Sequence, residues 1–177
     1  YEVNKSVEGE LYPEQTSKIA EFLEAYKNNN NPLKPSILHF DEIRKIKPNP
    51  NSKIQTKVHV SDYYLIDKET NTHHIIELKI GGDLDNKKAR SEKEAIFEQY
   101  AILANSLGEK ANIQAHFATA YNRFGEDNEW KQGRVLQFFS KDELLIGRDF
   151  WNFVCKSEQG YEMVLETYKE NAYLITN

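Results

Sequence analysis

Hydrophobic residues recur with two different periods along this chain, and the first is helical. After Pro13, apolar side chains follow helical spacing over residues 14–27, and the four asparagines that end at Asn31 terminate that segment. Residues 35–51 hold three prolines and predict a loop, with a short helical turn at 41–46. The first fifty residues therefore predict one helix and little other regular structure.

A period of two begins at Lys57 and indicates β-strands. A second apolar run covers residues 74–80, and the polar residues 68–71 between the two runs predict a tight turn. The two strands would form a hairpin. On its first strand, one face would carry Val58, Val60, Asp62, Tyr64 and Ile66.

Helical spacing returns after the hairpin. Gly81 and Gly82 break the second strand, and a long helix is predicted from about Asn86 until Gly108 closes it. The remaining expected elements are strands at 111–121 and 135–139 and helices at 142–146, 150–154 and 161–170. This order predicts an α/β fold, a mixed central β-sheet flanked by helices.

Length and composition favour a single domain. A chain of 177 residues with 39% hydrophobic residues can bury one core, so we expect residues 1–177 to form one domain. No run approaches the roughly 18 to 20 apolar residues of a membrane span, and no signal peptide is evident, so we expect a soluble intracellular protein. The lone Cys155 is typical of a small core residue. A start at Tyr1 without methionine is compatible with a longer parent chain.

Charge is unevenly distributed. The net charge of −5 argues against binding DNA by bulk electrostatics, but two basic clusters stand on this acidic background. One lies within residues 43–60, and the other lies in the first turns of the long helix, where the helix dipole disfavours cations. We therefore expect DNA contacts from Arg44, Lys45, Lys87, Lys88, Arg90 and Lys93. Alternatively, Glu92 and Glu94 pair with Lys88 and Arg90 along the helix, which would leave only a solvated face.

The candidate catalytic residues lie in the segment Glu77-Leu78-Lys79. An acidic residue, a spacer and a lysine is a weak motif, because Asp85-Asn86-Lys87 and Glu129-Trp130-Lys131 repeat it in segments read as loop or helix start. Only the first copy falls on a predicted strand, where residues two apart share a face. Glu77 and Lys79 are therefore expected side by side.

Asp62 completes the constellation. If the hairpin turns symmetrically between Glu69 and Thr70, residues whose numbers sum to 139 face each other, so Asp62 lies opposite Glu77. Two carboxylates across a sheet repel each other, and a divalent cation removes the conflict. We expect Mg²⁺, held by Asp62, Glu77 and the Leu78 carbonyl, with Lys79 orienting the attacking water and stabilising developing charge.

Less specific interpretations remain open for these residues. Asp62 could cap a strand end while Glu77 and Lys79 form an exposed ion pair. Asp67 is a rival acid, although it adjoins the turn, where aspartate is common for local hydrogen bonding. The five histidines show no zinc-like spacing.

The order Asp62, hairpin turn, Glu77-Leu78-Lys79 and helix resembles the PD-(D/E)XK nuclease superfamily and its restriction-endonuclease-like core, with Ser61 where a proline usually precedes the aspartate. The stretches IIELKIGGDLDNKKARSEKEAIFEQYAIL, HFATAYN and LLIGRDFWNFVC resemble type II restriction endonucleases of the TdeIII family, over roughly residues 47–168. The resemblance implies Asp62 and Glu77 as metal ligands and Lys79 as the water-positioning residue. It also suggests auxiliary roles for Gln99 and a helix glutamate such as Glu24.

The resemblance further implies an activity. Such an enzyme hydrolyses double-stranded DNA at a short site with Mg²⁺, or Mn²⁺ in its place, leaving 5′-phosphate ends. It would act in the bacterial cytoplasm beside a DNA methyltransferase that protects host DNA, and a homodimer suits a symmetric site. Two alternatives remain: a structure-specific repair or junction-resolving nuclease, and a non-catalytic DNA-binding module.

Overall fold

A five-stranded mixed sheet forms the centre of the protein. The structure, a computed structural model, describes residues 1–172 except the side chain of Lys5. The strand order is β1-β2-β3-β4-β5, with the first three strands antiparallel and the last two parallel to β3. The strands are β1 (Glu2–Leu11), β2 (Gln55–Asp67), β3 (Thr72–Leu78), β4 (Asn112–Thr119) and β5 (Leu144–Ile146). The predicted mixed α/β fold is confirmed.

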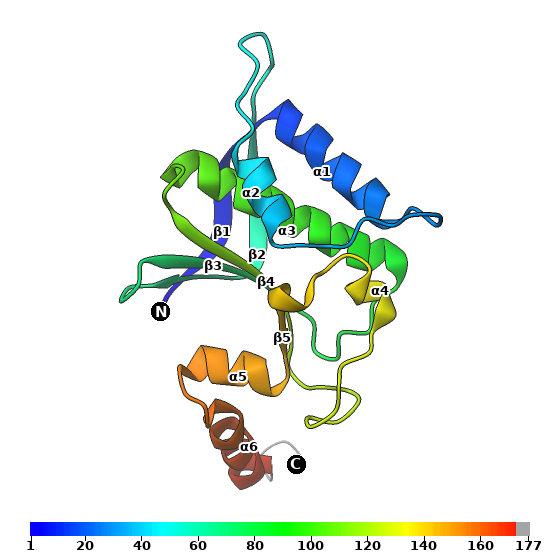
Figure 1. Ribbon diagram of the computed structural model, residues 1–177. Coiled ribbons are helices and arrows are strands. Elements are labelled where there is room, and N and C mark those ends of the chain that lie inside the picture. Colours follow the sequence, from blue (N-terminus) through cyan, green and yellow to red (C-terminus); the bar gives the residue numbers. More distant parts are fainter. Residues whose placement is uncertain (173–177) are drawn as a thin grey trace.

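Helices cover both faces of this sheet (Figure 1). α1, α2 and α3 gather on one side, whereas α5 and α6 lie at the opposite end of the molecule, beyond β5. The helices are α1 (Pro13–Tyr26), α2 (Leu38–Arg44), α3 (Asn86–Leu107), α4 (Gly133–Leu136), α5 (Arg148–Cys155) and α6 (Gly160–Asn171). Within residues 1–172, no helix is long and apolar enough to cross a membrane.

Two hydrophobic clusters fix the sheet between its helices. The larger one packs α3, through residues such as Phe97, against Ile75 of β3, α1 and α2. The smaller one lies on the other face, where Phe150 of α5 packs on Leu65 and Ile76. Each large apolar side chain that is fully buried contributes about 1.5–3 kcal/mol of transfer free energy. Successive residues of β3 therefore alternate between the two clusters, which fixes the face that each side chain occupies.

The hairpin of β2 and β3 has the predicted register. Its paired residues run from Tyr63 opposite Ile76 to Asp67 opposite Thr72, around a turn at 68–71. The ladder ends at Tyr63 and Ile76, so the predicted pairing of Asp62 with Glu77 falls just outside it. The symmetric turn assumed from the sequence is therefore confirmed.

A β-bulge in β2 overturns the predicted alternation. Asn4 of β1 pairs with Tyr64 but Ser6 pairs with Val60, so three residues of β2 stand opposite one residue of β1. The bulge reverses which residues face α3. Val58 and Val60 are 59% and 82% exposed, whereas Tyr64 is buried against α3. The prediction of a single apolar row was therefore wrong, and Asp62 does not lie in a buried apolar row.

Two short segments have a different secondary structure from the one predicted. The prediction was wrong for residues 135–139, which form α4 and the turn after it, and for residues 142–146, which form the end of a 3₁₀ turn (Lys141–Glu143) and β5. Both are short apolar runs, for which periodicity does not separate helix from strand. β1 was not predicted at all. The helices expected at 14–27, from Asn86 to Gly108, at 150–154 and at 161–170, and the strand at 111–121, are confirmed with small shifts of their ends.

Candidate active site

The ammonium group of Lys79 lies among three carboxylates where β3 ends. Its Nζ is 3.2 Å from Asp62 Oδ2, 3.6 Å from Glu77 Oε2 and 3.3 Å from Glu92 Oε1. Asp62 lies on β2, Glu77 on β3 and Glu92 on α3, and Lys79 directly follows the end of β3. Asp62, Glu77 and Lys79, which the sequence predicted together, are therefore brought together. One positive charge faces three negative ones.

Glu77 is the most buried of these acids, at 5% exposed. Burial raises its pKa to about 7, and the nearby Asp62 carboxylate adds to this rise, although a hydrogen bond from Gln99 opposes it. Gln99 Nε2 donates to Glu77 Oε1 at 3.0 Å, and Ser61 Oγ donates to Gln99 Oε1. Gln99, expected in an auxiliary role, does contact the site.

Asp62 reaches across from β2 to the end of β3. Its Oδ2 accepts hydrogen bonds from the Leu78 backbone N–H at 3.0 Å and from Lys79 Nζ. Its side chain is 40% exposed, so it is the more water-accessible of the two predicted metal ligands. The bulge at Ser61 and Asp62 turns both side chains toward the site.

Glu92 was missed as a site residue. The sequence suggested pairing along the helix with Lys88, but Glu92 instead contacts Lys79. Burial lowers the pKa of Lys79, and the charges of Glu92 and Asp62 more than offset this, so the pKa is raised overall. The seven-residue spacing between Glu92 and Gln99, two turns on one face of α3, was the signal that could have identified it.

The donor set fits a hard divalent cation with few protein ligands. In the described part of the chain, no group of three or more His, Cys, Asp or Glu side chains is arranged to hold a metal ion. Mg²⁺ is commonly held by only one or two carboxylates, and it keeps several waters. Asp62 and Glu77 are two such carboxylates, and both lie within 3.6 Å of Lys79 Nζ.

Comparison with known proteins identifies the family. Residues 1–172 match the family described as Type II restriction endonuclease, HinfI. The chain belongs to the HinfI family. No curated protein and no solved structure matches it. The family match makes the chain a type II site-specific deoxyribonuclease, a hydrolase, and it does not support the narrower TdeIII assignment.

The basic cluster of this HinfI-family chain at the start of α3 is split by the fold. Lys87 and Lys88 are exposed. Arg90 pairs with Glu94 and Glu24, both at 3.1 Å. The alternative of pairing along the helix is thus confirmed for Arg90 with Glu94. Lys93 is 0% exposed, so its predicted contact with DNA is wrong for this structure, because its side chain points into the core.

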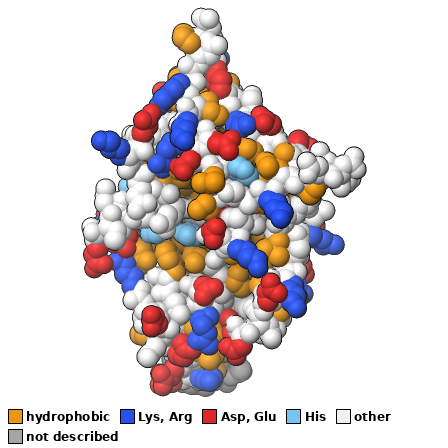
Figure 2. All heavy atoms as spheres, in the orientation of Figure 1, with side chains coloured by type: hydrophobic (Ala, Val, Ile, Leu, Met, Phe, Trp, Pro, Cys, Tyr) orange, Lys and Arg blue, Asp and Glu red, His pale blue; other side chains and the backbone are white. Residues whose placement is uncertain are grey.

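The first basic cluster is also partly engaged in the fold. Arg44 donates a hydrogen bond to the Glu109 carbonyl and its guanidinium lies over the ring of Tyr100. Lys45 is exposed. Glu24, the second auxiliary candidate, pairs with Arg90 and Lys27 and has no recorded contact with Lys79. Figure 2 shows cationic and anionic side chains interspersed over the visible face, without one broad basic patch.

Asp67, the rival acid, has a structural role. It pairs with Lys156 at 3.0 Å and accepts a hydrogen bond from the Glu69 N–H in the turn. It lies at the turn end of the hairpin, five residues along β2 from Asp62. The interpretation that Asp67 serves the turn is supported.

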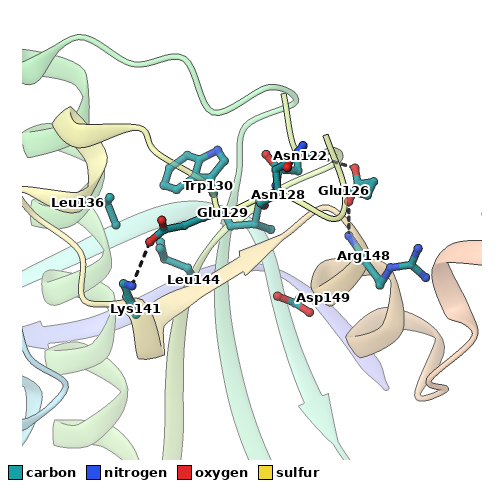
Figure 3. Close-up of a pocket in the computed structure, with 11 residues that line it drawn as sticks. Asn122, Glu126, Asn128, Glu129, Trp130, Leu136, Lys141, Leu144, Arg148 and Asp149 are labelled. Atoms are coloured by element: carbon teal, nitrogen blue, oxygen red, sulfur yellow. Dashed lines mark hydrogen bonds and ion pairs between the residues drawn. The ribbon is translucent and has the colours of Figure 1, made fainter. Parts of the chain in front are cut away.

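A cavity of about 250 Å³ beside β5 is separate from this site (Figure 3). Trp130 and Leu136 lie along one side of it, and Arg148 and Asp149 lie at the start of α5. Asp62, Glu77 and Lys79 do not line it. The candidate active site therefore rests on its side-chain geometry and not on this cavity.

Proposed function

We propose that this chain cleaves double-stranded DNA at a specific sequence with Mg²⁺, using Asp62, Glu77 and Lys79. The observation that carries the proposal is the pairing of two carboxylates from adjacent strands beside one lysine. Family membership supplies the substrate class, DNA. The described residues would act as one nuclease domain.

Each site residue has a distinct role in this proposal. Asp62, Glu77 and the Leu78 carbonyl would hold Mg²⁺, which supplies Lewis-acid activation of water and offsets phosphate charge. Lys79 Nζ orients the attacking water and stabilises the negative charge that develops on the phosphate oxygens. The water oxygen bonds to phosphorus as the bond to the 3′ oxygen breaks. The products are a 5′-phosphate and a 3′-hydroxyl, and protons exchange with solvent.

A DNA substrate also suggests which residues contact phosphate, how the protein assembles and which enzyme accompanies it. Lys87, Lys88 and Lys45 are exposed and suited to phosphate contacts. Cutting both strands of a symmetric site calls for two active sites, and we propose a two-fold homodimer. A restriction enzyme in a bacterial cytoplasm also needs a methyltransferase that protects host DNA, and we propose that pairing for this chain.

The decisive experiment incubates the protein with unmethylated phage DNA and Mg²⁺. We expect discrete fragments, and we expect none with the Glu77→Gln variant or in EDTA. Smearing, or preference for branched DNA, would instead indicate a repair or junction-resolving nuclease. If folded protein neither cleaves DNA nor binds Mn²⁺ in calorimetry, the proposal is wrong and a non-catalytic module remains.

A further inference from the structure

We propose that Ser61 is a positioning residue that holds the Glu77 carboxylate in place through the side-chain amide of Gln99. The inference rests on the proposed role of Glu77 and concerns a residue that does not itself touch the metal or DNA. Ser61 Oγ contacts Gln99 Oε1, and Gln99 Nε2 contacts Glu77 Oε1 at 3.0 Å. The three side chains form one chain of hydrogen bonds from β2 through α3 to β3.

The chemistry of the groups sets the direction of this chain. Glu77 must be ionised to hold a metal ion, and an ionised carboxylate only accepts hydrogen bonds, so in that state Gln99 must turn its NH₂ toward Glu77. Its carbonyl oxygen then faces Ser61, whose hydroxyl donates to it. The reverse amide orientation would place a carbonyl oxygen against the carboxylate, which is repulsive. Ser61 therefore favours the one orientation in which Gln99 supports Glu77.

Ser61 and Gln99 are buried, so the loss of one hydrogen bond between them would affect Glu77. Ser61 is 5% exposed and Gln99 is 1% exposed, so water cannot readily replace a lost partner. Without the hydroxyl, the Gln99 carbonyl oxygen would lose its recorded partner in a buried environment, and the amide would be free to rotate. Glu77 Oε1 would then lose its fixed donor, while Oε2 keeps only Lys79 at 3.6 Å.

The bulge explains how Ser61 comes to face the site. Regular alternation would direct Ser61 and Asp62 to opposite faces of β2. The register shift between β1 and β2 instead allows Ser61 to contact Gln99 of α3 and Asp62 to contact the end of β3. A proline at position 61 would lack this hydroxyl, so serine supplies a contact that the superfamily pattern does not contain.

The first test compares Ser61→Ala with wild type. We expect kcat for DNA cleavage and Mn²⁺ affinity of the DNA-free protein to fall about tenfold, the lower end for residues that orient metal ligands. KM for DNA should stay within about twofold, because Ser61 is buried. Ser61→Thr, which keeps the hydroxyl, should recover most of both losses.

The control is Ser106→Ala, at an exposed serine of α3. Ser106 lies on α3 and donates to the Ile102 carbonyl of its own helix. We expect wild-type kcat and Mn²⁺ affinity for this variant. A loss equal to that of Ser61→Ala would show that removing any serine near α3 has the same general effect, and it would overturn the inference.

A double-mutant cycle tests whether Ser61 acts through Gln99. In a Gln99→Ala background, Ser61→Ala should cause no further loss, because the intermediate group is already absent. A full tenfold loss in both backgrounds would overturn the proposed route. If Glu77→Gln abolishes cleavage and Mn²⁺ binding but Ser61→Ala behaves as wild type, only this inference fails. If Glu77→Gln still cleaves, the proposed function fails instead.

Discussion

Glu92 and Lys93 are neighbours on α3, yet they join charge clusters of opposite kinds. Lys93 is fully buried and pairs with Glu143, which is 1% exposed. The Lys93 ammonium also lies over the rings of Phe40, Phe97 and Phe139, at 4.2–5.1 Å from their centroids. Burial lowers the pKa of Lys93, and the Glu143 carboxylate opposes that shift. This cluster holds one cation and one anion.

Glu92, in contrast, faces a cluster with unequal charge. Three carboxylates surround Lys79, and the side chains of Asp62 and Lys79 are 40% and 28% exposed. A balanced, enclosed pair has no need of a further ion, whereas an unbalanced cluster with access to water can take up a cation. Charge balance and water access together therefore distinguish a structural ion pair from a candidate active site in the same helix.

Replacing the lysine of each cluster by methionine should give the largest difference between the two clusters, in cleavage rate and in stability. Lys79→Met should lower kcat about 100- to 1000-fold, because a group that stabilises developing phosphate charge is worth about 2.7–4 kcal/mol. Stability should change by at most about 1 kcal/mol for each of the partly exposed partners Asp62 and Glu92, and the buried Glu77 can take up a proton in place of the lost cation. A cleavage assay and urea unfolding measure the two effects. Retained cleavage would remove Lys79 from the site.

Lys93→Met should show the reverse pattern. It leaves Glu143 as an unpaired buried carboxylate, which costs about 3–5 kcal/mol of unfolding free energy. Cleavage by the fraction that remains folded should be close to normal. Adding Glu143→Gln removes the buried charge while keeping an acceptor for Ser140, so the double variant should regain most of the stability in urea unfolding. No recovery would contradict the electrostatic explanation.

The raised pKa of Glu77 makes the metal-free protein sensitive to pH. The pKa rises from 4.5 to about 7 on folding, so the folded state retains a proton more readily than the unfolded state. The contribution to stability is present below about pH 4.5 and is lost as pH rises through 7, by on the order of 3 kcal/mol. In EDTA, Glu77→Gln should therefore be stabilised relative to wild type more at pH 8 than at pH 5. An equal difference at both pH values would contradict this.

The smallest effect is expected from the exposed lysines of α3. Replacing Lys87 and Lys88 together by alanine should weaken DNA binding modestly. The slope of log affinity against log salt concentration should become shallower by up to about 2, if each lysine contacts one phosphate. Lys110→Ala, beyond the other end of α3, is the matched control and should leave the slope unchanged. An unchanged slope in the double variant would remove this surface from the DNA interface.

The sequence predicted the hairpin that carries the site better than the β-bulge and the strand β1 beside it. Hairpin register depends on a local turn, and that turn is symmetric, so the pairing up to Tyr63 and Ile76, which brings Asp62 and Glu77 near Lys79, could be worked out in advance. The bulge could not, because it depends on a mismatch with β1, a strand that lies about fifty residues earlier. β1 itself was hidden by its many polar residues, as only Val7 and Leu11 of this strand join the core.

The missed residues share a physical cause. Whether a charged residue on α3 faces the site or the core depends on how the helix is rotated against the sheet, which periodicity alone fixes only coarsely. Lys93 was therefore placed on the surface although it is enclosed, and Glu92 was assigned to its own helix although it reaches Lys79. The weak Glu77-Leu78-Lys79 motif was separated from its two copies by strand context, which the fold confirms.

The rotation of α3 also makes the chain sensitive to insertions and deletions. Each residue of an α-helix turns the chain by about 100°, so one residue added between Lys93 and Phe97 would rotate everything after it. Phe97 would leave the core and Gln99 would leave Glu77, while Glu92 stayed at Lys79. Exposed positions of α3 can therefore change in identity more readily than α3 can change in length. Insertions should be tolerated only outside the helix, as in the loop before Asn86.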